Sequence, residues 1–322
     1  MAIYTKISRN DVVLIEKKFN LGKIISFKGI KKGIENTNYL IRTKKNKYIL
    51  TIFEKRVQKK DLPFFMNLMD KLYNYNINCP KPQKSNAGNY SINIKNKPAS
   101  IVSFVDGKDK NKLKITDCYE IGKNIAKLHI VSKKIKLYRK NSMSLKSWPK
   151  LINKIGNKYK KIDVNLNDLI KNSFLDIKKN WPKKLTNGII HGDLFIDNIF
   201  FKKNKFHGYI DFYFASNDFF MYEIAICINA LCFDKKNRKF VFNGRKSKNL
   251  LKGYSGQRKL STKEKKSLNI LCKGAALRYL LTRAYDYLNT PKSAIIKIKD
   301  PREYIQKLKI HNKFNSFKDY YN

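Results

Sequence analysis

Cysteine is scarce in this sequence and is not arranged in pairs. The 322 residues contain five Cys, scattered along the chain and without a Cys-x-x-Cys motif. Such a set does not predict a disulfide framework, and reduced thiols that fill the core of a cytoplasmic protein explain it most simply. The five are Cys79, Cys118, Cys227, Cys232 and Cys272.

Long hydrophobic runs are also missing. No apolar stretch approaches the length of about eighteen residues that crosses a bilayer, so no membrane span is expected. Residues 1–20 are polar and charged, without the apolar centre of a secretory signal. Hydrophobic residues make up 42% of the chain and aromatic residues 13%, which is typical of a globular protein with one large or two ordinary domains.

Acidic residues are few compared with basic ones. The 24 Asp and Glu stand against 70 Lys and Arg, which gives a formal net charge of +46. A basic surface attracts polyanions, so a nucleic-acid-binding protein is one alternative. Most of the basic residues are Lys, however, and they are spread along the whole chain, whereas specific phosphate and base readout favours Arg. We therefore expect a solvated basic surface and no specific nucleic-acid partner.

The segment His191–Phe200 is the most informative part of the chain. It contains an Asp and, five positions later, an Asn, and a second Asp follows in Ile210-Asp211-Phe212. This arrangement is typical of a base and two metal ligands around a transferred phosphoryl group. Asp193 is predicted to accept the proton of an attacking hydroxyl, and Asn198 and Asp211 to offer hard oxygen ligands to Mg²⁺.

Two short strands are expected to bring these residues together. Residues 198–201 and 206–212 are apolar runs joined by a polar turn, which is a hairpin signal, and the hairpin would return Asp211 to the side of Asn198. The alternative is that Asp193 caps a turn and Asp211 ends a strand independently. That alternative explains each acid separately but not their joint spacing, so the sequence predicts a kinase that uses ATP and Mg²⁺.

The motif His-Gly-Asp-x-x-x-x-Asn with a downstream Ile-Asp-Phe resembles the aminoglycoside phosphotransferase and choline kinase group of protein-kinase-like enzymes. The flanking sequence is similar to one branch of that group, the bacterial homoserine kinases. The stretches that carry this resemblance span almost the whole chain: Phe27–Ile30, Gly33–Tyr39, Tyr48–Thr51, Asp61–Phe65, Ile210–Ala215, Ala276–Arg283 and Lys299–Pro301.

The resemblance implies an α+β, protein-kinase-like fold of two lobes. We expect residues 1–105 to form a small nucleotide-binding lobe, an antiparallel sheet plus one helix, with the hinge at its end. Residues 106–322 would form a large, mostly helical lobe for catalysis and substrate binding. The implied reaction is transfer of the γ-phosphoryl group of ATP to the hydroxyl of L-homoserine, giving O-phospho-L-homoserine, the precursor of threonine. The same fold phosphorylates choline, ethanolamine, methylthioribose and aminoglycosides, so these acceptors remain alternatives.

Two segments are predicted to contact the nucleotide. The loop from Gly29 to Asn38 would lie over the phosphates, since glycine permits positive φ and close backbone approach. The segment that ends the small lobe is similar to a kinase hinge, where backbone groups meet adenine. The residues assigned to the nucleotide are Gly29, Gly33, Asn36, Asn38, Ser103, Phe104 and Val105.

One position departs from the kinase pattern. Kinases usually carry a Lys on the third strand, and the matching residue here is Thr51, as it is in the homoserine kinases that the sequence resembles. Either Lys28 or Lys55 reaches the phosphates instead, or the site relies on Mg²⁺ and backbone donors.

The acceptor pocket is predicted from the charges of homoserine. A helix is expected over residues 268–289, where Arg278 could clamp a carboxylate and Asp286 lies about 80° away around the helix. Asp218 could bind the ammonium group. The alternatives are that this helix face is solvated and that Asp218 is the N-cap of a helix over residues 219–231.

Overall fold

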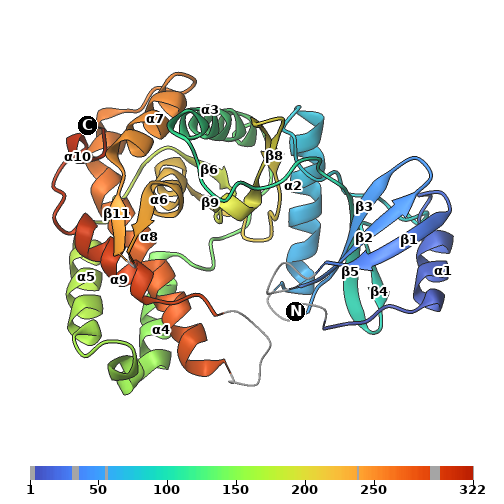
Figure 1. The fold of residues 1–322 in the computed structure, drawn as a ribbon, viewed down its shortest axis with the longest axis horizontal. Helices are drawn as coiled ribbons and strands as arrows, with labels where there is room; N and C mark the ends of the chain where they lie inside the picture. Colours follow the sequence, from blue (N-terminus) through green and yellow to red (C-terminus); the bar gives the residue numbers. More distant parts are fainter. Residues whose placement is uncertain (1–3, 31–35, 55–56, 238, 291–297, 322) are drawn as a thin grey trace. The chain divides into compact units, whose positions relative to one another are not determined.

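The computed structural model describes residues 4–30, 36–54, 57–237, 239–290 and 298–321 (Figure 1). These residues form two compact units. The first contains the described residues up to Gly107 together with His207–Tyr213, and the second contains Lys108–Phe206 and the described residues from Phe214 onward. No local sequence pattern indicated that His207–Tyr213 packs with the first unit. The assignment of residues 1–105 and 106–322 to a nucleotide lobe and a catalytic lobe stays a prediction.

The first unit is built on a five-stranded antiparallel sheet with the order β1-β2-β3-β5-β4. Its strands are β1 (Ile24–Gly29), β2 (Thr37–Thr43), β3 (Lys47–Ile52), β4 (Ser91–Ile94) and β5 (Lys97–Ser103). Side chains of alternate residues point to opposite faces of a strand, so Tyr39 and Ile41 of β2 enter one core with Leu50 and Ile101.

Two helices accompany this sheet, where the sequence analysis expected one. Helix α2 (Leu62–Asn74), preceded by a 3₁₀ turn (Lys59–Asp61), is the expected helix. Helix α1 (Arg9–Lys18) was not expected. It begins with a capping box, in which Ser8 and Asp11 satisfy each other's backbone N–H groups, and its Ile15 packs into the sheet core.

The second unit is mainly helical. Its helices are α3 (Ile115–Ser132), α4 (Trp148–Ile155), α5 (Leu166–Asn180), α6 (Phe220–Leu231), α7 (Gly244–Ser255), α8 (Thr262–Asn289), α9 (Arg302–His311) and α10 (Lys318–Tyr321), with 3₁₀ turns at Leu145–Ser147, Gly156–Lys161 and Ile196–Asn198. Three two-stranded sheets contain the other strands of the described residues. They pair β6 (Asn187–Ile190) with β9 (Ser216–Phe219), β7 (Ile199–Lys202) with β8 (Lys205–Tyr209), and β10 (Phe233–Lys236) with β11 (Lys239–Phe242).

Helix α8 is the central element of this unit. It begins at a capping box between Ser261 and Glu264 and packs against α4, α5, α6 and α9. Because neighbours cover it on several sides, its middle turns are buried almost all round, and Leu277, Leu280 and Leu281 are inaccessible to solvent.

Helices α3 and α7 approach each other more closely than most helix pairs can. A Cβ atom added to Gly122 would lie 2.0 Å from the carbonyl oxygen of Leu250, and one added to Gly253 would lie 2.0 Å from that of Tyr119. Only glycine therefore fits at these two positions. The close packing fixes α3, which carries a buried His129, against α7.

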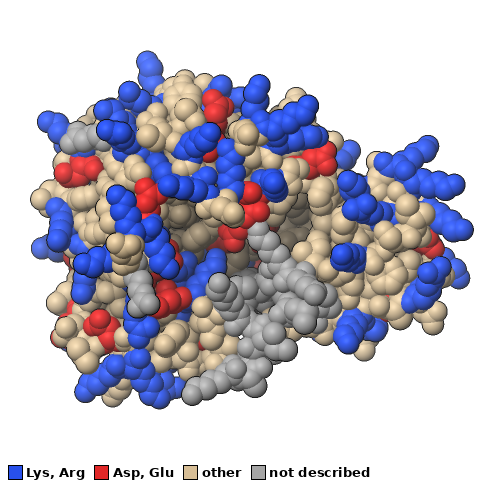
Figure 2. All heavy atoms as spheres, viewed as in Figure 1, with Lys and Arg blue, Asp and Glu red and all other residues tan. Residues whose placement is uncertain are grey.

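Basic side chains are dispersed over the visible face of the protein (Figure 2). Figure 2 shows Lys and Arg side chains spread over the visible face of each unit rather than gathered into one patch. This agrees with the expectation of a solvated basic surface. Among the described residues, the helices include none that is both long and apolar enough to cross a membrane.

Candidate active site

The predicted catalytic loop lies between β6 and β7. It turns at Gly192, whose φ is +79°, and a Cβ atom there would lie 2.8 Å from the carbonyl oxygen of Phe214. Both the backbone conformation and the close contact require glycine. The loop then ends in the 3₁₀ turn Ile196–Asn198.

The structure brings Asp193 and Asn198 together. Asn198 Nδ2 lies 2.8 Å from the carbonyl oxygen of Asp193 and 3.3 Å from Asp193 Oδ2, and donates to both. Since Nδ2 makes these bonds, Asn198 Oδ1 is the atom of the amide that can meet a cation. Asp193 itself is half-buried, as suits a base that must reach a substrate.

Helix α8 supports the loop with two side chains. Tyr279 Oη lies 3.1 Å from Asp193 Oδ1 and 3.3 Å from the carbonyl oxygen of Gly192, and Arg278 Nη1 donates to the same carbonyl at 3.2 Å. The Arg278 guanidinium also lies over the Tyr279 ring, 4.2 Å from its centre. Arg278 is only 5% exposed, so the alternative of a solvated helix face is wrong at this residue.

Glu223 of α6 holds the loop from inside the core. Its carboxylate accepts hydrogen bonds from the backbone N–H groups of His191 (3.0 Å) and Gly192 (2.7 Å) and contacts His129 Nε2 at 2.9 Å. Burial opposes ionisation of Glu223, but the hydrogen bonds that its carboxylate accepts from His129 and from the Gly192 N–H outweigh that effect and lower the pKa of Glu223. The loop backbone is therefore fixed by a buried carboxylate.

His129 is a structural residue. Its ring is fully buried and bonds to Glu223 on one side and to Tyr254 Oη, at 2.8 Å, on the other. Burial lowers the pKa of His129, which keeps the imidazole neutral. A neutral ring that donates from Nε2 to Glu223 and accepts at Nδ1 from Tyr254 satisfies both contacts.

Asp218 is not a helix cap. It lies in β9, and α6 begins two residues later with no side-chain cap on its N-terminus. Asp218 Oδ2 accepts from Asn141 Nδ2 at 2.6 Å and Oδ1 from the Phe219 N–H at 2.7 Å, while burial raises the pKa of Asp218. Asp286 is half-buried near the end of α8. The roles of Asp218 and Asp286 in substrate binding stay predictions.

Asp211 belongs to the first unit, whereas Asp193 and Asn198 belong to the second, so the convergence of the three stays a prediction. Asp211 has φ +65° and lies beyond the end of β8, not at the end of a strand as expected. The ring of Tyr213, two residues after Asp211, packs edge-on against the rings of Phe53 and Phe65, with ring centres 5.0 Å and 5.7 Å apart. The unusual backbone at Asp211 is typical of functional sites.

The residues predicted to meet the phosphates surround the ends of β1 to β3. Gly29 is the last residue of β1 and lies opposite Tyr39, and Gly33 lies outside the described residues. Asn36 Oδ1 accepts from the Glu54 N–H at 3.4 Å. The residue that replaces the usual lysine is occupied within the sheet, since Thr51 Oγ1 donates to Asn38 Oδ1 at 2.8 Å across the β2–β3 pair.

The predicted hinge follows β5. Ser103 Oγ accepts from the Lys81 N–H at 2.8 Å, and the Phe104 N–H donates to the carbonyl of Lys47 at 3.1 Å. Val105 is buried. Nucleotide binding by these residues stays a prediction. Of the two cations considered for the phosphates, Lys28 is exposed on β1 and Lys55 lies outside the described residues.

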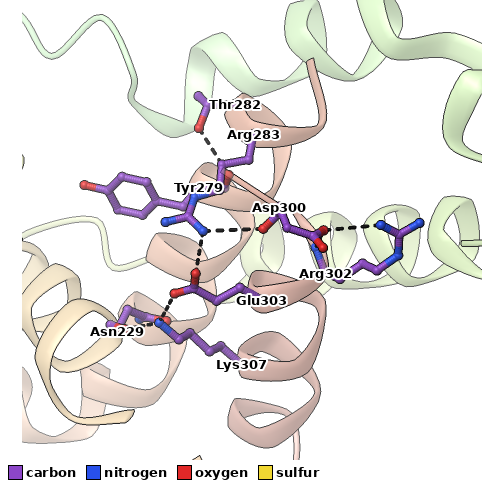
Figure 3. Close-up of polar contacts among 8 residues, drawn as sticks. All are labelled: Asn229, Tyr279, Thr282, Arg283, Asp300, Arg302, Glu303 and Lys307. Carbon is purple, nitrogen blue, oxygen red and sulfur yellow. Dashed lines mark hydrogen bonds and ion pairs between the residues drawn. The ribbon is translucent and has the colours of Figure 1, made fainter. Parts of the chain in front are cut away.

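Arg283 makes a structural ion pair with α9. Figure 3 shows its guanidinium turned toward α9, where Nη1 meets Glu303 Oε2 at 2.7 Å. Glu303 Oε1 in turn accepts from Lys307 at 2.6 Å, and Lys307 also donates to the carbonyl of Asn229 at 2.7 Å. Arg283 thus joins α8 to α9 and does not serve the loop.

The supporting roles of Glu223 and Tyr279 were not predicted from the sequence. Glu223 was recognisable, because a lone acid in an otherwise apolar helix needs a buried partner. Tyr279 carried no such signal, since a tyrosine on a mostly apolar helix is an ordinary core residue.

Comparison with known proteins identifies the class of enzyme. Residues 26–241 match the phosphotransferase enzyme family, and the chain belongs to that family. Similar solved structures include amicoumacin kinase hAmiN in complex with AMP-PNP, Ca²⁺ and Ami (TM-score 0.72, 14% identity, 96% of this chain and 95% of that one). A choline kinase from Cryptosporidium parvum Iowa II gives a TM-score of 0.66 at 17% identity, covering 94% of this chain and 96% of that one. They confirm the protein-kinase-like fold.

Sequence relatives identify the branch of the family. A homoserine kinase from Mesorhizobium japonicum is 39% identical over 320 residues, which cover 99% of both chains. One from Rhizobium etli is also 39% identical over 320 residues, with the same coverage. The chain therefore belongs to the homoserine kinase branch, and the resemblance seen in the sequence is confirmed.

Proposed function

We propose that this protein transfers the γ-phosphoryl group of ATP to the side-chain hydroxyl of L-homoserine, giving O-phospho-L-homoserine, the precursor of threonine. The full-length identity to homoserine kinases carries this proposal. The hydrogen-bonded pair of Asp193 and Asn198 on a rigid loop supplies the chemistry. The five free, buried cysteines agree with the proposed cytoplasmic location.

Asp193 accepts the proton of the homoserine hydroxyl as that oxygen attacks the phosphorus. Tyr279 and Asn198 orient its carboxylate by hydrogen bonds. Glu223 fixes the backbone that carries it. Together these contacts hold the carboxylate of Asp193 in one orientation. Fixed positioning of a few protein groups is a main source of rate acceleration in phosphoryl transfer.

Asn198 and Asp211 are the proposed ligands of Mg²⁺. Asn198 Oδ1 and the Asp211 carboxylate are hard oxygen donors, the kind that Mg²⁺ prefers. When bound, the ion neutralises charge on the phosphates. The similar amicoumacin kinase holds an ATP analogue and a divalent cation, which supports ATP and a divalent metal here. Gly29, Gly33, Asn36, Asn38 and the hinge, Ser103–Val105, are the proposed nucleotide contacts.

A substrate panel tests this function. Purified protein with ATP and Mg²⁺ would be offered L-homoserine, choline, ethanolamine, methylthioribose and an aminoglycoside, with ADP formation as the readout and ³¹P NMR to identify products. We expect O-phospho-L-homoserine as the main product and no turnover once EDTA removes the metal. Preferential phosphorylation of another acceptor would refute the homoserine assignment, and nucleic-acid affinity that persisted at physiological salt would favour the alternative class.

A further inference from the structure

The second unit encloses a small cavity beside Gly192 of the catalytic loop. Its walls include Asn141, Gly192, Ser216, Tyr222 and Arg278. The space open to the centre of a water molecule is about 10 Å³. The cavity is adjacent to the catalytic loop, because Arg278 bonds to the carbonyl of Gly192, the residue before Asp193.

Three polar atoms in the walls of this cavity are buried and have no hydrogen-bond partner among the described residues. They are Arg278 Nε, Tyr222 Oη and Ser216 Oγ. Buried polar atoms are paired in the great majority of cases, so three unpaired ones around one cavity point to a missing partner. All three can donate a hydrogen bond, and one belongs to a cation.

Several acceptors in or near the walls of the cavity already take hydrogen bonds from other groups. Asp218 takes hydrogen bonds from Asn141 and from the Phe219 N–H, and Asn141 Oδ1 takes one from the Met143 N–H. The Gly192 carbonyl accepts hydrogen bonds from Arg278 and Tyr279 of α8. Among the described residues none accepts a hydrogen bond from Arg278 Nε, Tyr222 Oη or Ser216 Oγ, so a bound molecule can supply that acceptor.

We propose that this cavity receives the α-carboxylate of the acceptor amino acid, with Arg278 as the opposite charge and the hydroxyls of Tyr222 and Ser216 as neutral donors. The inference rests on the proposed function and adds the means by which the site selects an amino acid over an amino alcohol. A carboxylate needs more room than the cavity now offers. Binding of a carboxylate would therefore require the turn at Ser142 and Met143, which forms one wall, to move.

The test compares L-homoserine with 3-amino-1-propanol, which is the same molecule without its carboxylate. Tyr222→Phe and Ser216→Ala remove hydroxyls that bond to nothing in the described structure, so both variants should fold with unchanged or higher stability. We expect each to lower kcat/KM for L-homoserine by about 10- to 100-fold, the loss of one hydrogen bond to a charged group. For 3-amino-1-propanol, kcat/KM if it is a substrate, or the inhibition constant if it is a competitive inhibitor, should stay within about twofold of the wild-type value.

Two matched variants serve as controls. Tyr304→Phe and Ser247→Ala also remove buried hydroxyls that lack a partner among the described residues, but neither residue lines the cavity. Both should behave as wild type toward L-homoserine and toward 3-amino-1-propanol.

The outcomes separate this inference from the function on which it rests. Equal losses for the two compounds would mean a structural role, and an unchanged constant for L-homoserine would mean that the cavity holds a structural water only; either result overturns the inference. Wild-type protein that fails to phosphorylate L-homoserine at all would overturn the proposed function as well.

Discussion

The hydroxyl of Tyr279 lies 3.1 Å from Oδ1 of Asp193 and donates to it, which ties helix α8 directly to the proposed base. Two more contacts hold the Tyr279 ring, since Phe195 meets it edge-on at 5.0 Å and Arg278 lies over its face. The hydroxyl can therefore be removed while the ring stays in place.

Tyr279→Phe should lower kcat for L-homoserine by about 10-fold or more, because an incorrectly oriented base costs transition-state stabilisation. KM should change little if Tyr279 acts only on the base. Steady-state kinetics with L-homoserine check this, and Tyr285→Phe on the same helix is the control. A raised KM with unchanged kcat would instead make Tyr279 a substrate-binding residue.

Glu223→Gln should destabilise the protein and slow turnover. The amide has one acceptor oxygen where the carboxylate has two, so a backbone N–H of the loop or His129 loses its partner inside the core. We expect the free energy of unfolding to fall by about 2–4 kcal/mol. Urea unfolding measures this loss, and Asp168→Asn, which changes an exposed carboxylate, should be neutral. Equal effects of the two substitutions would contradict the role given to Glu223.

The ion-pair network between α8 and α9 should contribute to stability according to burial. Glu303→Gln removes the charge that Arg283 and the buried Lys307 share, and should cost about 3–5 kcal/mol. Arg302→Gln removes an exposed pair with Asp300 and a contact with the Tyr287 ring, and should change stability by less than about 1 kcal/mol. Chemical denaturation of both variants at one pH compares them, and a similar cost for each would show that burial does not decide the effect.

Stability should fall as the solution becomes acidic. Burial, together with the charges of Lys307 and Lys273, lowers the pKa of His311 from its ordinary value of 6.5 to about 3. The unfolded chain therefore takes up a proton that the folded protein refuses, so stability is complete above pH 6.5 and declines as the pH drops toward 3. His311 alone should contribute a slope of about 1.4 kcal/mol per pH unit.

Urea unfolding at pH 7, 6 and 5 measures that slope. Burial also lowers the pKa of His129, so His129 makes stability fall with acid in the same way, and it is present in both wild type and the His311→Gln variant. His311→Gln should be less stable than wild type at pH 7 and show a shallower decline with acid. Parallel pH dependences of the two proteins would contradict the assignment of a neutral, buried His311.

The parts of the site that the sequence predicted are local in the chain. Asp193 and Asn198 were paired correctly because a single turn of backbone joins them. Likewise, the hairpin expected over residues 198–212 is present as β7 paired with β8, because its two apolar runs and the polar turn between them are adjacent in the sequence.

The parts that were missed depend on packing between distant segments. A helical wheel could not tell that Arg278 is buried, because α8 has neighbours on several sides. Asp218 looked like a helix cap, but the pairing of β9 with β6 and the bond from Asn141 keep it in a strand. Such contacts join residues far apart in sequence, and no local pattern encodes them.

The rate of phosphoryl transfer from γ-labelled ATP to L-homoserine, compared between wild type and Asp193→Asn, tests the central claim most directly. Wild-type protein should form labelled O-phospho-L-homoserine, and Asp193→Asn should do so about 10²- to 10⁴-fold more slowly, the usual contribution of a positioned base. Its affinity for ATP should remain near that of wild type. Wild-type turnover in Asp193→Asn would contradict the account.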